Sequence, residues 1–207
     1  LKVIFCIDRA GLVGEDGATH QGVFDIAYLR CIPNIEIFAP RNEVELRNIL
    51  YTAQLPEQDK ALAIRYPRGY GQLTMWQLPF EKIEKKGVQL REGTRYAVLS
   101  VGTIADEVAQ EIGQHPDASA FSHYDMRWIK PLDEALLHQV LGKYEAVITV
   151  EEGCKAGGFG ESIVVFAKEK GYSLPIRIVA IADVFVEHGS VALQRAFTGL
   201  TGFLEER

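Results

Sequence analysis

The chain alternates between short unbroken apolar runs and longer stretches in which apolar residues recur every three or four positions. An unbroken run such as 2–7 is typical of a strand buried in a parallel sheet, whereas the spaced pattern over 43–54 indicates an amphipathic helix. Further strands are predicted at 35–38, 61–64, 96–101, 120–124, 146–151 and 176–180. Further helices are predicted at 24–30, 104–112, 134–141, 161–170 and 193–206. Strands that alternate with helices predict parallel sheets covered on both faces.

A change in composition divides this pattern into two series. Residues 70–95 contain Gly, Pro and the charged stretch 81–86 without a helical period. We therefore expect a linker there, with a small β-hairpin around 83–90. The predicted fold class is α/β, with two parallel-sheet units at 1–69 and 96–207.

The net charge of the chain is negative, which argues against some classes of binding partner. The chain has 207 residues, with 22 Lys and Arg against 28 Asp and Glu, a net charge of −6. An acidic chain lacks the basic surface of a nucleic-acid binder. No apolar run approaches the roughly 18 residues of a membrane span, so no membrane is expected. The three cysteines are widely spaced and form no CxxC pair, which favours a reducing compartment, the cytoplasm.

The long loop after the first predicted strand is the most informative segment. Residues 8–22 include four glycines together with Arg9, Asp16 and His20. The loop follows a strand at its carboxyl end, where open α/β sheets bind ligands. Arg68 follows another predicted strand, so it is expected to reach the same cleft as Arg9. Loops of this length in compact domains are usually either functional or disordered.

The sequence of this loop closely resembles a known enzyme family. Residues 8–34 read DRAGLVGEDGATHQGVFDIAYLRCIPN, which resembles the corresponding motif of the 1-deoxy-D-xylulose-5-phosphate synthases, thiamine-diphosphate enzymes of the transketolase family. The GEDG-x-TH core is shared with transketolase, whereas the HQGVFD continuation looks like the synthases. Further matches follow in the family's order: RYPRG at 65–69, DMRWIKPLD at 125–133, EEG at 151–153 and GGFG at 157–160.

The resemblance implies an activity and roles for particular residues. The family joins two carbons of pyruvate, with loss of CO2, to glyceraldehyde 3-phosphate, which supplies precursors of isoprenoids, thiamine and pyridoxol. Arg9 and Arg68 match the family's arginines that hold the phosphate of the aldehyde substrate, a group that a guanidinium fork binds well. His20 matches a histidine near the reacting carbons, where an imidazole can move a proton. Asp16 matches an acid that bonds substrate hydroxyls or orients this histidine. Family members are homodimers.

The resemblance covers only the later part of the family's sequence. The family binds Mg2+ and the diphosphate of thiamine diphosphate with a GDG…N signature, which this chain lacks. We therefore expect a C-terminal fragment that is inactive alone and binds neither cofactor tightly. It would comprise the end of the pyrimidine-binding domain and the C-terminal domain. Alternatives are a transketolase-like subunit, a keto-acid dehydrogenase β-type subunit, or a non-catalytic dimerisation domain.

Two further motifs are interpreted as structural. The glycines of 157–160 follow a strand but lack the GxGxxG spacing of a dinucleotide site, so we expect a structural turn. Glu151 and Glu152 are adjacent in a predicted strand and should point to opposite faces, which excludes a shared catalytic pair.

Overall fold

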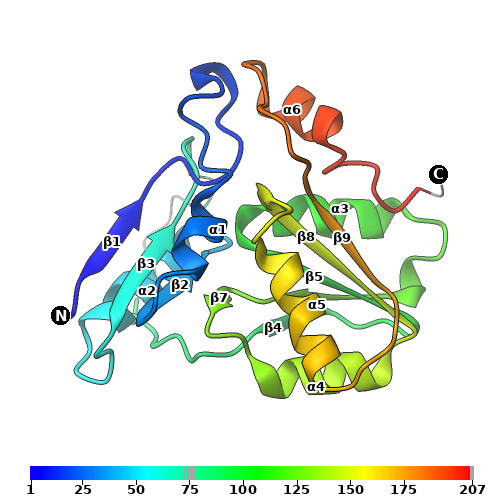
Figure 1. Cartoon of the computed structure of the whole chain (residues 1–207), viewed down its shortest axis with the longest axis horizontal. Helices are drawn as coiled ribbons and strands as arrows, with labels where there is room; N and C mark the ends of the chain where they lie inside the picture. Colours follow the sequence, from blue (N-terminus) through cyan, green and yellow to red (C-terminus); the bar gives the residue numbers. More distant parts are fainter. Residues whose placement is uncertain (72, 74–77, 206–207) are drawn as a thin grey trace.

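The structure, a computed structural model, describes residues 1–71, 73 and 78–205. Within them the chain forms two β-sheets with helices packed on their faces (Figure 1). The strands are β1 (Ile4–Ile7), β2 (Ile35–Phe38), β3 (Ala61–Arg65), β4 (Val88–Arg91), β5 (Tyr96–Val101), β6 (Phe121–Asp125), β7 (Trp128–Lys130), β8 (Ala146–Cys154) and β9 (Ile176–Ile181). The α-helices are α1 (Asp25–Arg30), α2 (Glu43–Gln54), α3 (Ala105–Gln114), α4 (Glu134–Lys143), α5 (Phe159–Glu169) and α6 (Val191–Thr198).

The first sheet has the strand order β1-β3-β2-β7. Strands β1, β3 and β2 are parallel, as their apolar runs predict. Strand β7 was not predicted and pairs antiparallel with β2, placing Trp128 opposite Phe38. This strand is only three residues long and its partner lies far away in sequence, so no local pattern identifies it. It joins a segment from the second half of the chain to the first sheet.

The second sheet has the strand order β4-β6-β5-β8-β9. Strands β5, β6, β8 and β9 are parallel, and β4 pairs antiparallel with β6 at the edge. The hairpin expected around 83–90 does not form in this described stretch. Instead, the Ile83 amide donates to Thr52 Oγ1 at 2.8 Å, and its side chain packs in a cluster with Phe38 and Trp128.

Helix ends follow local capping chemistry. The Asp133 side chain accepts from the Leu136 amide at 3.0 Å and begins α4, as its position in the sequence predicts. The last helix is shorter than the predicted span 193–206. It ends at Thr198 because Gly199 adopts a left-handed conformation, φ +72°, which closes the helix.

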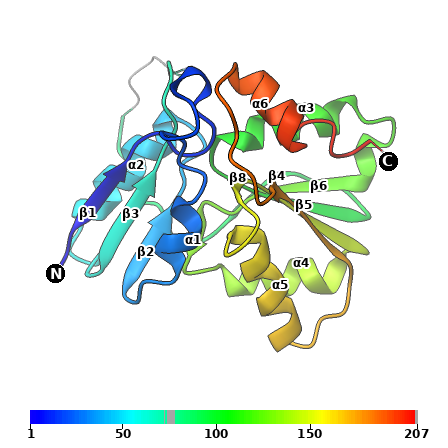
Figure 2. The ribbon, with the colours of Figure 1, turned by 45° about the horizontal axis from the view of Figure 1, so that its top comes forward.

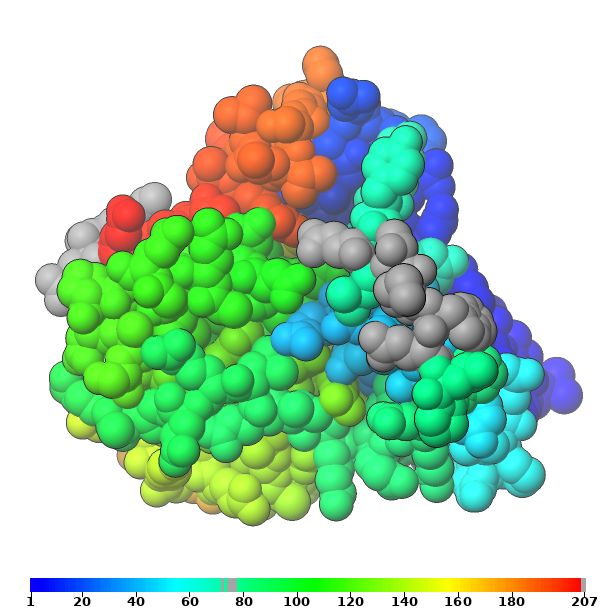
Figure 3. Space-filling view, turned by 180° about the vertical axis from the view of Figure 1, so that it is seen from behind, coloured from blue at the N-terminus to red at the C-terminus, as the bar shows by residue number. Residues whose placement is uncertain are grey.

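The two sheets share one apolar core. A single cluster of buried side chains contains Ile26 and Ile37 from the first half of the chain together with Leu99 and Met126 from the second. Above this core, the loop after β1 lies beside the segment that precedes α6 (Figures 1 and 2). From behind, the orange surface of that segment directly adjoins the blue surface of the loop (Figure 3). The loop with the predicted site residues therefore lies against a segment from near the other end of the chain.

Candidate active-site loop

The loop that follows β1 is closed at its base by backbone hydrogen bonds. Gly11 donates to the Gly22 carbonyl at 2.9 Å, and Gly22 donates to the Arg9 carbonyl at 2.8 Å. A Cβ on Gly22 would lie 2.4 Å from the Arg9 carbonyl oxygen, so only glycine permits this approach. Arg9 itself has φ +59°, an unusual conformation for a side-chain-bearing residue. Closure of the loop therefore fixes the direction in which Arg9 leaves the backbone.

Asp16 brings the two predicted arginines together. Arg9 Nε donates to Asp16 Oδ2 at 3.1 Å, and Arg68 Nη1 donates to Asp16 Oδ1. Arg9 also pairs with Asp8 at 2.5 Å. The side chains of Arg9 and Arg68 are 37% and 53% exposed, whereas that of Asp16 is 20% exposed. Two solvent-facing guanidinium groups thus share one carboxylate, an arrangement suited to an anionic ligand.

His20 lies on the same loop but outside this group of ion pairs. Its backbone amide donates to Gly17 at 3.1 Å, and its Nδ1 lies 3.0 Å from Thr19 Oγ1. The ring is exposed. Within residues 1–71, 73 and 78–205 no hydrogen bond joins His20 to Arg9, Asp16 or Arg68. The structure brings three of the four predicted site residues together and leaves His20 beside them on the loop.

Arg65 supports the loop from below. It forms a buried ion pair with Asp25, Nε to Oδ2 at 2.9 Å, with the two side chains 3% and 2% exposed. Its Nη2 donates to the Gly22 carbonyl at 3.1 Å and to the Glu152 carbonyl at 3.2 Å. Burial lowers the pKa of Arg65, but the charge and hydrogen bond of Asp25, together with the nearby charges of Glu152 and Glu151, outweigh burial and the net shift is upward. The structure thus ties this arginine to the base of the loop.

The two adjacent glutamates of β8 have separate partners, as their opposite orientation predicts. Glu151 accepts from the amides of Phe159 and Gly160, each at 2.7 Å. Burial raises the pKa of Glu151 to about 7, against these hydrogen bonds and nearby arginines. Glu152 pairs with Arg195 at 2.6 Å. The start of α5 is therefore occupied by a side chain of the chain itself, and the preceding glycines form a structural turn.

The residues do not fit a site for a metal-bound diphosphate. Over the described part of the chain, no group of three His, Cys, Asp or Glu side chains is placed to hold a metal ion. The glycine-rich turn before α5, which resembles an anion site, is filled by Glu151.

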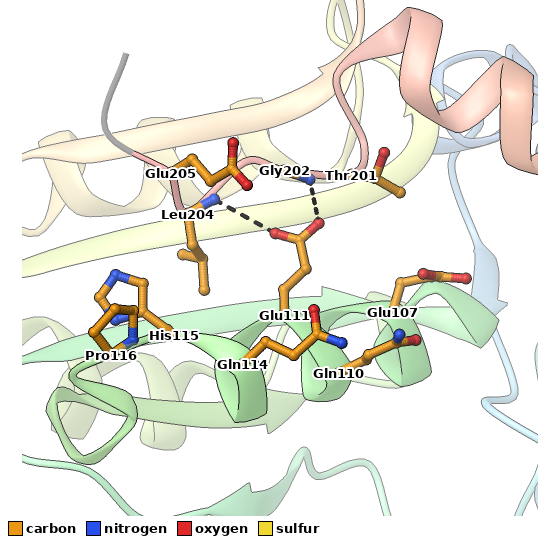
Figure 4. A pocket seen from close by; sticks show the side chains of 10 residues that line it. All are labelled: Glu107, Gln110, Glu111, Gln114, His115, Pro116, Thr201, Gly202, Leu204 and Glu205. Atoms are coloured by element: carbon orange, nitrogen blue, oxygen red, sulfur yellow. Dashed lines mark hydrogen bonds between the residues drawn. The ribbon is translucent and has the colours of Figure 1, made fainter.

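One hollow among the described residues lies away from the predicted site. A cavity of about 390 Å3 opens between α3 and the segment 201–205 (Figure 4). Glu111 anchors its wall by accepting from the Gly202, Phe203 and Leu204 amides at 2.5, 3.1 and 3.4 Å. The carboxylate has backbone partners and holds the C-terminal segment in place, so the cavity belongs to the packing of this segment on α3.

Comparison with protein families gives matches over both halves of the chain. Residues 1–72 match the transketolase pyrimidine-binding domain, and residues 85–202 match the transketolase C-terminal domain. The family expected from the sequence motifs is confirmed at both ends of the chain.

Curated relatives are 1-deoxy-D-xylulose-5-phosphate synthases. The enzyme of Bacteroides fragilis is 50% identical over 194 residues, 92% of this chain and 30% of the relative. The enzyme of Cytophaga hutchinsonii is 46% identical over 195 residues, 93% of this chain and 30% of the relative. That of Acidovorax sp. is 43% identical over 204 residues, 97% of this chain and 31% of the relative. The chain thus spans about a third of the length of these relatives.

Solved structures show the same fold. A split-gene transketolase, described as an inactive beta4 tetramer, superposes with a TM-score of 0.80 at 28% identity, over 96% of this chain and 62% of that chain. Transketolase from Campylobacter jejuni superposes with a TM-score of 0.67 at 17% identity, over 96% of this chain and 29% of that chain. No helix among the described residues is long and apolar enough to cross a membrane.

Proposed function

Because the chain belongs to the transketolase family and is 50% identical to a 1-deoxy-D-xylulose-5-phosphate synthase over 92% of its length, we propose that it supplies the substrate-phosphate side of such a synthase's active site. The whole protein would join two carbons of pyruvate to glyceraldehyde 3-phosphate with loss of CO2, a step towards isoprenoids, thiamine and pyridoxol. The observation that carries this proposal is the pairing of Arg9 and Arg68 around Asp16.

The two arginines have the chemistry of a phosphate site. Each guanidinium has five N–H donors. Asp16 occupies one on each arginine, and Asp8 occupies a second on Arg9. Both therefore keep donors for the oxygens of a phosphate dianion, which a planar fork binds with parallel charge-assisted bonds. Asp16 holds the arginines close together before a ligand arrives. We propose that the same carboxylate accepts from a hydroxyl of the bound aldehyde.

His20 completes this side of the site. Its exposed ring lies four residues after Asp16 on the same closed loop. An imidazole in this place can hold a proton for the alkoxide that forms at the aldehyde carbon during carbon–carbon bond formation. Arg9 and Arg68 would orient the aldehyde by its phosphate, so that the reacting carbon faces His20.

The cofactor belongs to the whole protein. Thiamine diphosphate with Mg2+ supplies the stabilised carbanion chemistry of the reaction. We propose that this chain alone is inactive and binds neither cofactor tightly, because its sequence lacks the GDG…N signature with which the family binds Mg2+ and the diphosphate. We also propose that the whole protein is a cytoplasmic homodimer; the exposed free thiols of Cys6 and Cys31 support a reducing compartment.

The sheet membership of most strands supports a division of the chain into two units, while β4 and β7 pair across the proposed boundaries. We propose that 1–69 is part of the pyrimidine-binding domain, that 70–95 is a linker, and that 96–207 is the C-terminal domain. Strands β1, β2 and β3 lie in one sheet and β5, β6, β8 and β9 in the other, which supports this division.

A transketolase-like subunit is the second candidate. The split-gene transketolase shares the fold over 96% of this chain at 28% identity. A donor assay with the whole protein separates the two functions. A synthase consumes pyruvate with release of CO2, whereas a transketolase takes its two-carbon unit from a ketose phosphate.

The proposed phosphate role is tested by the variant Arg68→Ala in the whole protein. We expect KM for glyceraldehyde 3-phosphate to rise by about ten- to a hundredfold, because a charge-assisted bond to phosphate is lost. KM for pyruvate should change little, since pyruvate has no phosphate. Steady-state kinetics with each substrate varied in turn gives both constants.

The matched control is Arg91→Ala, which removes an exposed arginine on β4 of the other sheet. It should leave both constants unchanged. Equal increases in the two KM values for Arg68→Ala would contradict the phosphate role.

A further inference from the structure

The C-terminal part of the chain holds the loop that bears Asp16. Gln194, on α6, is 3% exposed although its side chain is polar. Its Oε1 accepts from the Gly14 amide at 2.9 Å, and its Nε2 donates to the Gly14 carbonyl at 3.1 Å. Both backbone groups of one loop residue are thus bound by one amide side chain that lies 180 positions later in the sequence.

Other contacts make this attachment rigid. Gln194 Nε2 also donates to the Glu187 carbonyl at 2.8 Å, so the amide is fixed at its own end. The Gly189 amide donates to the Gly14 carbonyl at 3.3 Å, and Gln21 Nε2 donates to the Val186 carbonyl at 2.7 Å. A Cβ on Gly14 would lie 3.2 Å from the Gly189 carbonyl oxygen, which shows how closely the two backbones approach. Segment 186–194 therefore forms hydrogen bonds with the loop at two places, Gly14 and Gln21.

Gly14, the residue that Gln194 binds, is the first residue of a turn that ends at Asp16. A 3-10 turn runs from Gly14 to Asp16, and Gly17 closes it by donating to the Gly14 carbonyl at 3.3 Å. Asp16 in turn bonds Arg9 and Arg68. Gly14 and Asp16 thus belong to one three-residue turn, so we expect a change in the position of Gly14 to move Asp16 as well.

We propose that Gln194 is a positioning residue, through which the C-terminal domain sets the place of Asp16 between the phosphate-binding arginines. This inference rests on the proposed function for the role of Asp16 in substrate binding. The hydrogen bonds between Gln194 and Gly14 are observed independently of that function. It gives the C-terminal domain a part in substrate binding through a residue that touches no substrate. A buried amide that binds both backbone groups of one residue suits this task, since its loss leaves the Gly14 amide without its hydrogen-bond acceptor.

The test uses the chain with Gln194→Leu, which keeps the volume and removes both hydrogen bonds to Gly14. The control is Gln139→Leu on the exposed face of α4. Two readouts are compared: hydrogen exchange of the Gly14 amide, and the Kd for glyceraldehyde 3-phosphate from an NMR titration. Glyceraldehyde without phosphate serves as the reference ligand.

We expect Gln194→Leu to speed exchange at Gly14 and to raise the Kd for the phosphorylated aldehyde by about three- to tenfold, the effect of losing one or two hydrogen bonds. Gln139→Leu should change neither. Faster exchange with the Kd unchanged within about twofold would overturn the inference, because the loop would then be loosened without consequence for the site. Unchanged exchange would overturn it as well.

Two additional variants keep the outcome decisive. If Gln194→Leu does not fold, Gln194→Glu preserves the shape and an acceptor for the Gly14 amide but loses the donor, and the same two readouts apply. Arg68→Ala separates this inference from the proposed function. If Arg68→Ala leaves the Kd unchanged, the phosphate role fails; if Arg68→Ala raises it and neither Gln194 variant does, the positioning role fails.

Discussion

Single buried residues of this chain have ionisation states set by their surroundings. His123 on β6 is 1% exposed, and its Nε2 lies 2.8 Å from Ser100 Oγ. Burial, together with the positive charge of Arg41, lowers the pKa of His123 from 6.5 to about 4. The pKa of Asp125 on the same strand is shifted the other way, to about 7, because burial and Glu45 disfavour its charged form. The ring of His123 is therefore neutral at pH 7 and serves as a hydrogen-bonding core residue.

The lowered pKa of His123 predicts a loss of stability in acid. Between pH 6.5 and 4, His123 is protonated in the unfolded state but stays neutral in the folded state. Its contribution to the free energy of unfolding therefore falls as the pH drops. The fall attributable to this group is at most about 1.4 kcal/mol per pH unit. The variant His123→Gln should remove that part of the slope in urea unfolding at pH 7, 6 and 5. His138→Gln, an exposed histidine on α4, should keep it. Equal slopes for wild type and His123→Gln would refute the assignment.

At the scale of elements, a buried ion pair connects parts that the sequence separates. Arg65 ends β3, Asp25 begins α1, and the Gly22 and Glu152 carbonyls that Arg65 also binds belong to the loop and to β8. Adjacent to it, Arg195 of α6 pairs with Glu152 of β8 and with Glu107 of α3. Charged side chains thus join the elements around the loop where apolar packing alone would not fix their register.

Removal of one partner of this buried pair should be costly. We expect Arg65→Met to lower the free energy of unfolding by about 3–5 kcal/mol, because Asp25 is left buried without its partner. The double variant Arg65→Met, Asp25→Leu should recover a large part of this loss, since no uncompensated charge remains. Urea unfolding followed by circular dichroism measures both. A double variant as unstable as Arg65→Met would show that the loss arises from the loop and β8 contacts instead of from the charge.

The elements differ in how far sequence could predict them. Buried parallel strands such as β3 were predicted well, because a short unbroken apolar run between polar residues is typical of a strand buried on both faces. Strand β7 was missed because it is short and its partner β2 is remote in sequence. The end of α6 was misplaced because the left-handed turn at Gly199 outweighs the apolar pattern that continues after it.

For the candidate site, too, the sequence predicted residues in local motifs but not residues that act through long-range contacts. Arg9, Asp16 and Arg68 were selected from motifs at strand ends, and the structure brings them together; their roles stay predictions. Gln194 and Arg195 were not selected, because they lie outside the recognised motifs and their contacts are 180 and 43 positions away in sequence. Sequence patterns identify groups that could act on a ligand, whereas the side chains that hold those groups in place depend on tertiary contacts.

At the scale of the whole molecule, both halves of the chain meet at one loop. Arg9 and Arg68 lie in the segments that follow β1 and β3 of the first sheet. Gln194 on α6 binds Gly14, and β8 contributes the Glu152 carbonyl that Arg65 binds. A shared apolar core fixes the two sheets beneath this loop. The chain spans about 30% of its Bacteroides fragilis relative, and the proposed division of labour places the substrate phosphate here and the cofactor's diphosphate elsewhere in the whole protein.

The most direct test of this account is an NMR titration of the chain with glyceraldehyde 3-phosphate and, separately, with glyceraldehyde. The account predicts saturable shifts confined to the amides of the loop and of Arg68 for the phosphorylated aldehyde, and none for the other. Arg68→Ala should weaken that binding by about tenfold or more, in line with the loss of a charge-assisted bond. Shifts that are equal for the two aldehydes, or that survive Arg68→Ala unchanged, would contradict it.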